Sequence, residues 1–149
     1  MFTYKVADTK DLEEIWDYNI RANAGDDRWV KWKTQLLADN AIGVCKTFVV
    51  LKDKQPIGEI TLLLKGDRPD NIIAARIMKE YEGQGHISKL LKLTEDHARA
   101  AGIKHLTIGC EAKETRSLAM YLHWGFTEFI SSAIEDKELV LYYRKAICL

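Results

Sequence analysis

Apolar and polar residues follow strand and helix periodicity in turn along the whole chain. Residues 2–6 alternate at period two, which predicts a strand with one face toward a core. Leu12, Ile15 and Trp16 then recur at helical spacing, and the aspartates before them would cap a helix over about residues 10–21. The same criteria predict the other elements in chain order: a helix from 26–28 to about 40, strands over 45–51, 57–64 and 71–78, a helix over 87–101, a strand over 105–110, a helix over 115–124, and strands over 126–131 and 138–144.

The predicted order of elements is β-α-α-β-β-β-α-β-α-β-β. Turn residues at 53–56 join two of the strands into a hairpin, whereas the later strand–helix–strand unit requires two parallel strands. Together they imply a mixed sheet that helices cover. The chain has no repeat, low-complexity segment or linker, so residues 1–149 are expected to form one domain.

Composition narrows the class of protein. The net charge is +0, so no basic excess points to nucleic acid or an anionic membrane as a partner. The first residues lack the apolar core of a signal peptide, and no apolar run approaches the length of a membrane span. Cys45, Cys110 and Cys148 form neither a CxxC pair nor a metal-binding spacing. We therefore expect a soluble cytoplasmic protein with free thiols and no metal.

A glycine-rich corner, Glu82-Gly83-Gln84-Gly85-His86-Ile87-Ser88, joins the strand over 71–78 to the next helix. Its two glycines allow a tight turn and keep side chains away from a ligand. The first amides of the helix have no intrahelical partner, and the helix dipole gives them partial positive charge. Such a corner binds a phosphate or pyrophosphate without a basic side chain.

Three stretches of the chain, in this order and at these separations, resemble the GNAT superfamily of acyl-CoA N-acyltransferases. Residues 77–91 resemble the family's strand–turn–helix run V-x-P-x-Y-R-G-x-G-I-G-S-x-L-L, and residues 100–106 resemble its A-x-x-x-G-x-x-x-L. Residues 118–126 resemble its A-x-x-L-Y-x-x-x-G-F. The resemblance implies an α/β fold with a mixed, mostly antiparallel sheet of about seven strands flanked by about four helices.

The resemblance also implies acetyl-CoA as the co-substrate. Backbone groups of Ile77, Met78 and Lys79 would pair with the pantetheine arm as if it were an added strand. Ser117, in the helix of the third motif, would also lie at the coenzyme. The pyrophosphate would be enclosed by the amides of the corner, with the Ser88 hydroxyl assisting: Gly83, Gln84, Gly85, His86, Ile87 and Ser88.

The chain departs from the family pattern at several positions near the coenzyme. Glu82 stands where the family has arginine or glutamine, and we expect this acid to point away from the pyrophosphate. Lys79 replaces a proline, Ile87 a glycine or alanine, and Glu114 an asparagine. These changes bear on coenzyme affinity and geometry more than on the fold.

Direct attack of an amine on a thioester needs both partners held together, a stabilised oxyanion and a proton for the departing thiolate. Tyr121 matches the family's tyrosine near the thioester sulfur, so the resemblance implies that Tyr121 is the general acid. Packing under the sheet is its alternative role. Glu111 at a strand end, Glu59 inside an apolar strand and, after them, Glu80 are candidate bases, and a water relay is the alternative.

The acceptor site of the family usually lies between the first two helices. Here that stretch contains Asp26, Asp27, Trp29 and Trp32, whose carboxylates and aromatic faces suit a cationic amine. The alternative is a capped amphipathic helix with buried tryptophans. The identity of the acceptor, small molecule or peptide, stays open, as does the homodimer that is common in the family.

The sequence therefore predicts an N-acetyltransferase that moves an acetyl group from acetyl-CoA to a primary amine in a ternary complex. A non-catalytic acyl-CoA-binding or sensing module is the alternative, in which Tyr121 would do no chemistry. A dinucleotide-binding domain is a third hypothesis, because Gly83-x-Gly85 partly matches G-x-G-x-x-G. Ser88, however, occupies the position of the third glycine in that motif.

Overall fold

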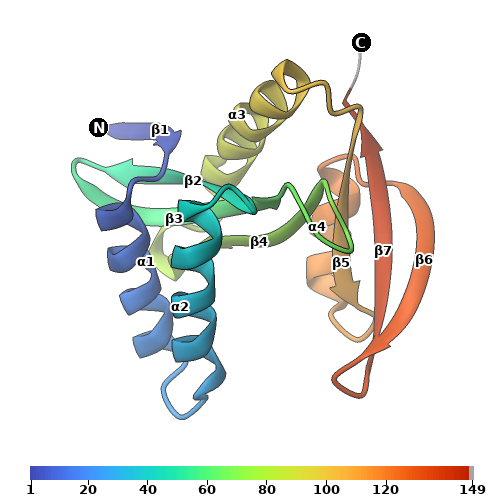
Figure 1. The fold of residues 1–149 in the computed structure, drawn as a ribbon, viewed down its shortest axis with the longest axis horizontal. Helices are drawn as coiled ribbons and strands as arrows, with labels where there is room; N and C mark the ends of the chain where they lie inside the picture. Colours follow the sequence, from blue (N-terminus) through green and yellow to red (C-terminus); the bar gives the residue numbers. More distant parts are fainter. Residues whose placement is uncertain (148–149) are drawn as a thin grey trace.

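The computed structural model describes residues 1–147, and its elements follow one another in the predicted order (Figure 1). The strands are β1 (Phe2–Val6), β2 (Cys45–Lys52), β3 (Gln55–Leu63), β4 (Asn71–Ile77), β5 (His105–Glu111), β6 (Glu128–Glu135) and β7 (Glu138–Ala146). The helices are α1 (Thr9–Ala22), α2 (Arg28–Ala41), α3 (His86–Ala100) and α4 (Thr115–His123), with a 3-10 turn at Lys79–Tyr81. Within residues 1–147, no helix has the length and apolar character needed to cross a membrane.

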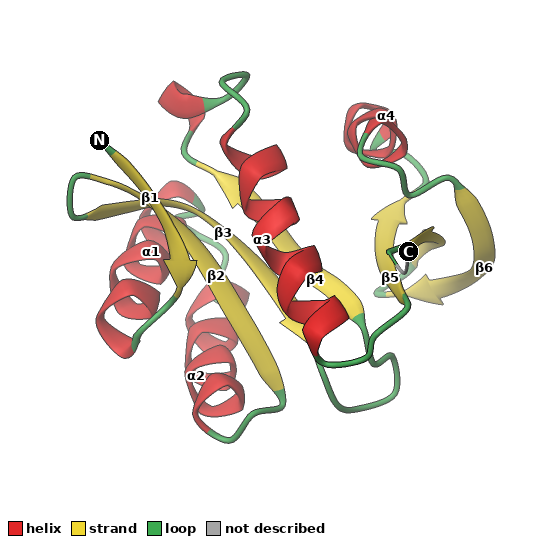
Figure 2. Ribbon diagram, turned by 90° about the horizontal axis from the view of Figure 1, so that it is seen from above, coloured by secondary structure: helices red, strands yellow, loops and turns green. Residues whose placement is uncertain are grey.

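All seven strands form one sheet in the order β1-β2-β3-β4-β5-β7-β6. Neighbours are antiparallel except β4 and β5, which run parallel and pair only at Asn71 with Thr107 and Ile72 with Ile108. Beyond these two positions the strands separate, and β5, β7 and β6 diverge from the first half of the sheet (Figures 1 and 2). The mixed, mostly antiparallel sheet with four flanking helices confirms the predicted fold class.

Helices cover both faces of the first half of the sheet. α1 and α2 pack side by side on one face, against β3 and β2, and α3 crosses the other face (Figure 2). α4 packs against β5 on the side where α3 lies (Figure 2). Phe48, Ile57 and Leu90 are fully buried between these layers, and each such side chain contributes about 1.5–3 kcal/mol through burial.

Two of the three cysteines are described, and both are free and buried. Burial raises the pKa of the Cys45 thiol to about 11 and also raises the pKa of Cys110. A thiol with a raised pKa carries little thiolate at neutral pH, so burial disfavours the nucleophilic form of both side chains. Cys148 lies outside the described residues.

The two N-terminal helices begin in different ways. The Asp8 carboxylate accepts from the Asp11 N–H at 2.8 Å, and the Asp11 carboxylate accepts from the Asp8 N–H at 3.0 Å, so the predicted cap of α1 is a complete capping box. Asp27 precedes α2 without a side-chain capping bond. Asp26 instead accepts from the Arg28 N–H at 3.1 Å.

Two predicted boundaries shift. The β2–β3 turn contains only Asp53 and Lys54, because Pro56 already belongs to β3 beside a register shift, where a missing N–H is tolerated. β6 begins at Glu128 rather than at residue 126. Phe126 is fully buried and donates its N–H to the carbonyl of Tyr121, which keeps it out of the strand ladder.

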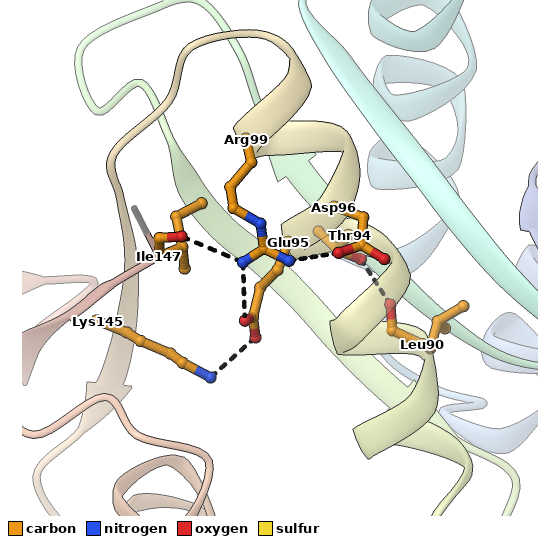
Figure 3. Close-up of polar contacts among 7 residues, drawn as sticks. All are labelled: Leu90, Thr94, Glu95, Asp96, Arg99, Lys145 and Ile147. Carbon is orange, nitrogen blue, oxygen red and sulfur yellow. Dashed lines mark hydrogen bonds and ion pairs between the residues drawn. The ribbon is translucent and has the colours of Figure 1, made fainter. Parts of the chain in front are cut away.

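A polar cluster ties α3 to the last strand (Figure 3). Glu95 accepts from Lys145 Nζ at 2.9 Å and lies 3.8 Å from the Arg99 guanidinium. Arg99 pairs with Asp96 and donates to the carbonyl of Ile147 at 3.2 Å. Because α3 packs on the first half of the sheet and Lys145 belongs to the second, the cluster joins the two halves across the gap between β4 and β5.

The first residue of α3, His86, is anchored to β1. Its Nδ1 lies 2.8 Å from the Tyr4 hydroxyl, and its ring packs on Phe2 with 4.3 Å between ring centroids. The side chain is buried, and burial lowers the pKa of His86, with a smaller contribution from the Lys89 cation. Neutral His86 therefore fixes the start of α3 against the sheet.

This anchor predicts a pH-dependent stability. Since the pKa of His86 is lower in the folded chain than its unfolded value of about 6.5, the unfolded chain takes up the proton first as pH falls. The stabilisation is complete above pH of about 6.5 and is lost as pH falls through the folded pKa. We expect the urea-derived free energy of unfolding to fall less steeply between pH 7.5 and about 5.5 in His86→Gln than in the wild type. Equal slopes in His86→Gln and the wild type would contradict the assignment.

Candidate active site

A cleft of about 660 Å³ lies where β4 and β5 separate. Its walls come from the C-terminal half of α1, the end of β4, the glycine corner with the start of α3, and α4. Most of the positions predicted to bind coenzyme line this one cavity: Ile77, Lys79, Gly83, Gly85, His86, Ile87, Ser88 and Ser117. Met78, Gln84 and the predicted acid Tyr121 are not among the residues that line it.

The glycine corner presents a row of free backbone donors. The six amides of residues 83–88 have no hydrogen-bond acceptor within residues 1–147. Gly83 and Gly85 have φ of +75° and +82°, a left-handed conformation that strains residues with a side chain. A Cβ at either position would meet no protein atom within 4 Å, so the protein requires glycine there for the backbone conformation and not for space.

The side chains of Gln84, His86 and Ile87 are engaged elsewhere in the protein. Gln84 contacts the carbonyl of Glu80 at 3.4 Å and His86 Nε2 at 3.3 Å, while His86 Nδ1 faces Tyr4. Ile87 is buried in the core, and Ser88 is exposed at the cleft. The corner therefore offers backbone amides and one hydroxyl, and its imidazole is engaged with the β1 anchor.

Glu82 is paired across the cleft with a residue that sequence reasoning missed. Its Oε2 lies 3.7 Å from Nη2 of Arg116 in the first turn of α4. Both side chains are exposed and both residues line the cleft, so this pair has little net energy of its own. Arg116 supplies a cation beside the corner where Glu82 does not. No local pattern distinguishes Arg116, because only the fold brings α4 to the corner.

The end of β4 offers an open edge toward the gap. Ile77 and Lys79 line the cleft, and the β5-facing side of β4 has no strand partner beyond Ile72. Met78 differs, because its N–H donates to the Ile57 carbonyl at 2.8 Å and its carbonyl accepts from the Tyr81 N–H at 2.9 Å. Of the three residues predicted to pair with a pantetheine arm, Met78 already has both backbone groups engaged.

Tyr121 lies in α4 next to Trp124, with 5.6 Å between ring centroids. Burial raises the pKa of Tyr121, Cys110 adds to the rise, and the Arg76 cation opposes it. A phenol with a raised pKa stays protonated at neutral pH, as a proton donor must.

Glu59 forms a buried polar cluster with two partners. Its Oε1 accepts from Arg76 Nη1 at 2.9 Å and its Oε2 accepts from Asn19 Nδ2 at 3.0 Å. Glu59 is fully buried, and its burial raises the pKa of the carboxyl while Arg76 and Asn19 act in the opposite direction. Arg76 lies opposite Glu59 in the β3–β4 register and was not recognised from the sequence. The sequence did contain a signal for this pair, namely one charged residue in each of two neighbouring apolar strands.

Glu111 points to the other face of β5. Cys110 faces α4, since its Sγ lies 3.6 Å from the Glu114 carbonyl, and side chains alternate along a strand. Glu111 is 42% exposed, lies 3.8 Å from Lys113 and borders a second cavity of about 650 Å³. Tyr121 and Glu111 thus lie on opposite faces of the sheet at the end of β5. Glu80, in the 3-10 turn, is exposed and lines neither cavity.

Of the predicted acceptor residues, Asp26 and Asp27 lie in the α1–α2 loop and Trp29 and Trp32 lie in α2, and arginines contact all but Asp27 within the described residues. Asp26 binds the Arg28 guanidinium at 2.8 Å, which lowers the pKa of Asp26 to about 2. Arg28 also lies 5.3 Å from the Trp32 ring, and Arg76 lies 4.8 Å from the Trp29 ring. Trp29 is partly buried against the core and Trp32 is 41% exposed.

The arrangement combines an anion-binding corner, an open strand edge and a protonated phenol on one side with carboxylates and guanidinium groups on the other. Phosphate and an extended polar chain fit the first side, since free amides and an unpaired edge are what such groups bind. In the described part of the chain, no three His, Cys, Asp or Glu side chains gather as metal ligands.

Comparisons with known proteins agree with this geometry. The profile of the Acetyltransferase (GNAT) family matches residues 9–126. No curated protein sequence matches the chain. A GNAT-family protein of Desulfovibrio desulfuricans superposes with a TM-score of 0.83 at 10% identity, covering 99% of this chain and 100% of its own. The ribosomal-protein-S18-alanine N-acetyltransferase of Escherichia coli gives 0.79 at 18% identity, covering 100% of this chain and 96% of its own.

The PaiA N-acetyltransferase of Thermoplasma acidophilum, solved in complex with coenzyme A, gives a TM-score of 0.67 at 14% identity, covering 96% of this chain and 98% of its own. At these identities the solved structures establish the fold, and the profile match establishes the family. The chain belongs to the acetyltransferase (GNAT) family.

Proposed function

We propose that this protein transfers an acetyl group from acetyl-CoA to a primary amine by direct attack in a ternary complex. The observation that carries the proposal is the cleft itself. It runs from six amides that have no acceptor within residues 1–147, along the open edge of β4, to side chains of α1 beside Arg76. A site of this form can hold a diphosphate-bearing thioester and a second molecule together, and positioning supplies much of the rate in a reaction of two substrates.

The free hydrogen-bond donors indicate which residues would bind the coenzyme. The amides of residues 83–88 and the Ser88 hydroxyl would bind the pyrophosphate, and Ile77 and Lys79 would pair with the pantetheine arm. Ser117 and the exposed Arg116 of α4 would close the other side of the cleft. Bound there, acetyl-CoA supplies an activated acyl group, so the chain needs no covalent nucleophile.

Proton transfer is divided between the two faces of β5. Tyr121 would hold its phenolic proton for the departing thiolate, consistent with its raised pKa. Glu111 suits the base better than Glu59, because it is partly exposed, whereas both oxygens of Glu59 are engaged by Arg76 and Asn19.

Substituting Gly85 tests the phosphate corner. Gly85→Ala places a side chain on a left-handed residue, which costs about 1–2 kcal/mol and shifts the amides around it. Gly102→Ala is the matched control, because Gly102 follows the other end of α3 with φ of +83° and equally open space. We expect similar losses in thermal stability, with weaker acetyl-CoA binding by calorimetry only in Gly85→Ala. Equal affinities in the two variants would contradict a role of the corner in binding.

Replacing Tyr121 with Phe removes the proposed acid and keeps the ring that packs on Trp124. We expect kcat with a broad panel of amines to fall by about 10²–10⁴-fold, with unchanged acetyl-CoA affinity. Tyr143→Phe is the control, since Tyr143 lies in β7 and packs on Phe129 of the edge strand β6. Unchanged turnover in Tyr121→Phe would remove Tyr121 as the acid. Tight coenzyme binding by the wild type without turnover of any amine would favour the non-catalytic binding module instead.

Substituting the two candidate bases should have different effects, a loss of activity for Glu111 and a loss of stability for Glu59. Glu111→Gln should lower kcat by about 10²-fold or more and leave thermal stability nearly unchanged. Glu59→Gln should instead destabilise the fold, by less than the roughly 3–5 kcal/mol typical of breaking a fully buried ion pair, because the remaining Arg76 is 30% exposed. Comparing turnover and melting temperature for both variants separates the roles. Full activity in Glu111→Gln would leave a water relay or Glu59 as the route for the proton.

A further inference from the structure

Arg76 holds a guanidinium at the wall of the cleft with most of its donors free. Arginine has five N–H donors, and within residues 1–147 Arg76 has one hydrogen-bond partner, Glu59, through Nη1. Neither Nε nor Nη2 contacts an acceptor in that part of the chain. The side chain is 30% exposed and lines the cleft beside Asn19 and Tyr18. Its remaining donors are therefore available to a molecule in the cavity.

The surroundings of Arg76 fix the position of this guanidinium. Glu59 is anchored by Asn19 and receives one edge of the group. The rings of Trp16 and Trp29 lie 5.1 and 4.8 Å from its central carbon, a distance at which indoles hold a guanidinium by cation–π attraction. A side chain held in this way loses little further conformational entropy when it binds a ligand. Arg76 should therefore bind a ligand more tightly than a flexible surface arginine would.

The charge of this wall does not suit a purely cationic acceptor. Trp29 already contacts the Arg76 cation, Trp32 contacts the Arg28 cation, and Asp26 is paired with Arg28. A carboxylate, by contrast, matches the planar fork of a guanidinium through two parallel hydrogen bonds. Arg76 immediately precedes Ile77 at the open edge of β4, and its charge is felt at Tyr121. A group bound to Arg76 would thus lie beside the proposed reacting centre.

We propose that Arg76 binds a carboxylate of the acceptor, so that the acceptor is an amino acid or another amine that also carries a carboxylate. This inference rests on the proposed acetyl transfer and assigns its substrate class. The cation beside the site would also favour the neutral form of the acceptor amine, which is the form that attacks.

Matched acceptors test the inference in the wild-type protein. The probes are the standard amino acids and their carboxamides, with acetyl-CoA consumption as the readout. A charged hydrogen-bonded pair of this kind predicts a KM about tenfold to a hundredfold lower for the acid, with a similar kcat. The carboxamide has the more acidic ammonium and hence more free amine, so a preference for the acid would not arise from amine ionisation. Equal use of both forms, or a preference for the carboxamide, would overturn the inference.

Two variants separate recognition from folding. Arg76→Lys keeps a cation for Glu59 but loses the fork, so the KM ratio of carboxamide to acid should fall toward one while acetyl-CoA affinity is retained. Arg144→Lys is the control, because Arg144 makes a two-bond pair with Glu128 at the far edge of the sheet. The KM ratio of carboxamide to acid in Arg144→Lys should match that of the wild type. A ratio unchanged in Arg76→Lys would also overturn the inference.

Binding measured without turnover distinguishes this inference from the proposed function. Tryptophan emission should respond to amino acids but not to their carboxamides, because Trp16 and Trp29 contact Arg76. If acetyl-CoA fails to bind while the amino acids do, the acetyl-transfer proposal fails and the carboxylate site stands. If acetyl-CoA binds and no carboxylate does, the carboxylate site fails alone.

Discussion

The parallel contact between β4 and β5 is the constraint on which the rest of the structure depends. Two strands of the same direction cannot be joined by a tight turn, so the chain must cross over the sheet, and α3 makes that crossing. The pairing stops after two residue pairs, which leaves the edge of β4 open and places the start of α3 at the mouth of the gap. The Glu95–Arg99–Lys145 contacts then join α3 to the diverging half of the sheet (Figure 3).

This separation of strands gives the site two faces. On the face of α3 and α4, the corner leaves six amides without partners in the described part of the chain, and burial raises the pKa of Tyr121. On the face of α1 and α2, Glu59, Arg76 and Asn19 form a fixed polar cluster, and Glu111 is exposed at the end of β5. Because the gap connects the two faces, two ligands can meet there without competing for the same wall. This geometry is the physical basis of the proposed ternary complex.

The sequence was sufficient for the order of elements, the fold class and the glycine corner, because these depend on local signals. Periodicity identifies strands and helices, and Gly83 and Gly85 provide the left-handed residues that the turn requires. Contacts that depend on the path of the chain were not predictable in this way. Arg116 reaches Glu82 only because α4 packs beside β5, and Arg76 meets Glu59 only through the β3–β4 register. The contact of the His86 ring with β1 was not predictable for the same reason, since Tyr4 and His86 are far apart in sequence.

The buried ion pair between Glu59 and Arg76 is poorly explained by stability alone. Moving the Glu59 carboxylate out of water offsets much of its attraction to the partly exposed Arg76, and apolar residues of similar volume often stabilise a core equally well or better. Apolar residues on β3 and β4 would also preserve the strand pattern, since both strands are otherwise largely apolar. What such residues could not provide is a guanidinium that is held by a carboxylate and two indoles and still has free donors at the cleft. The pair is therefore better understood as a means of presenting Arg76 than as a means of holding the sheet together.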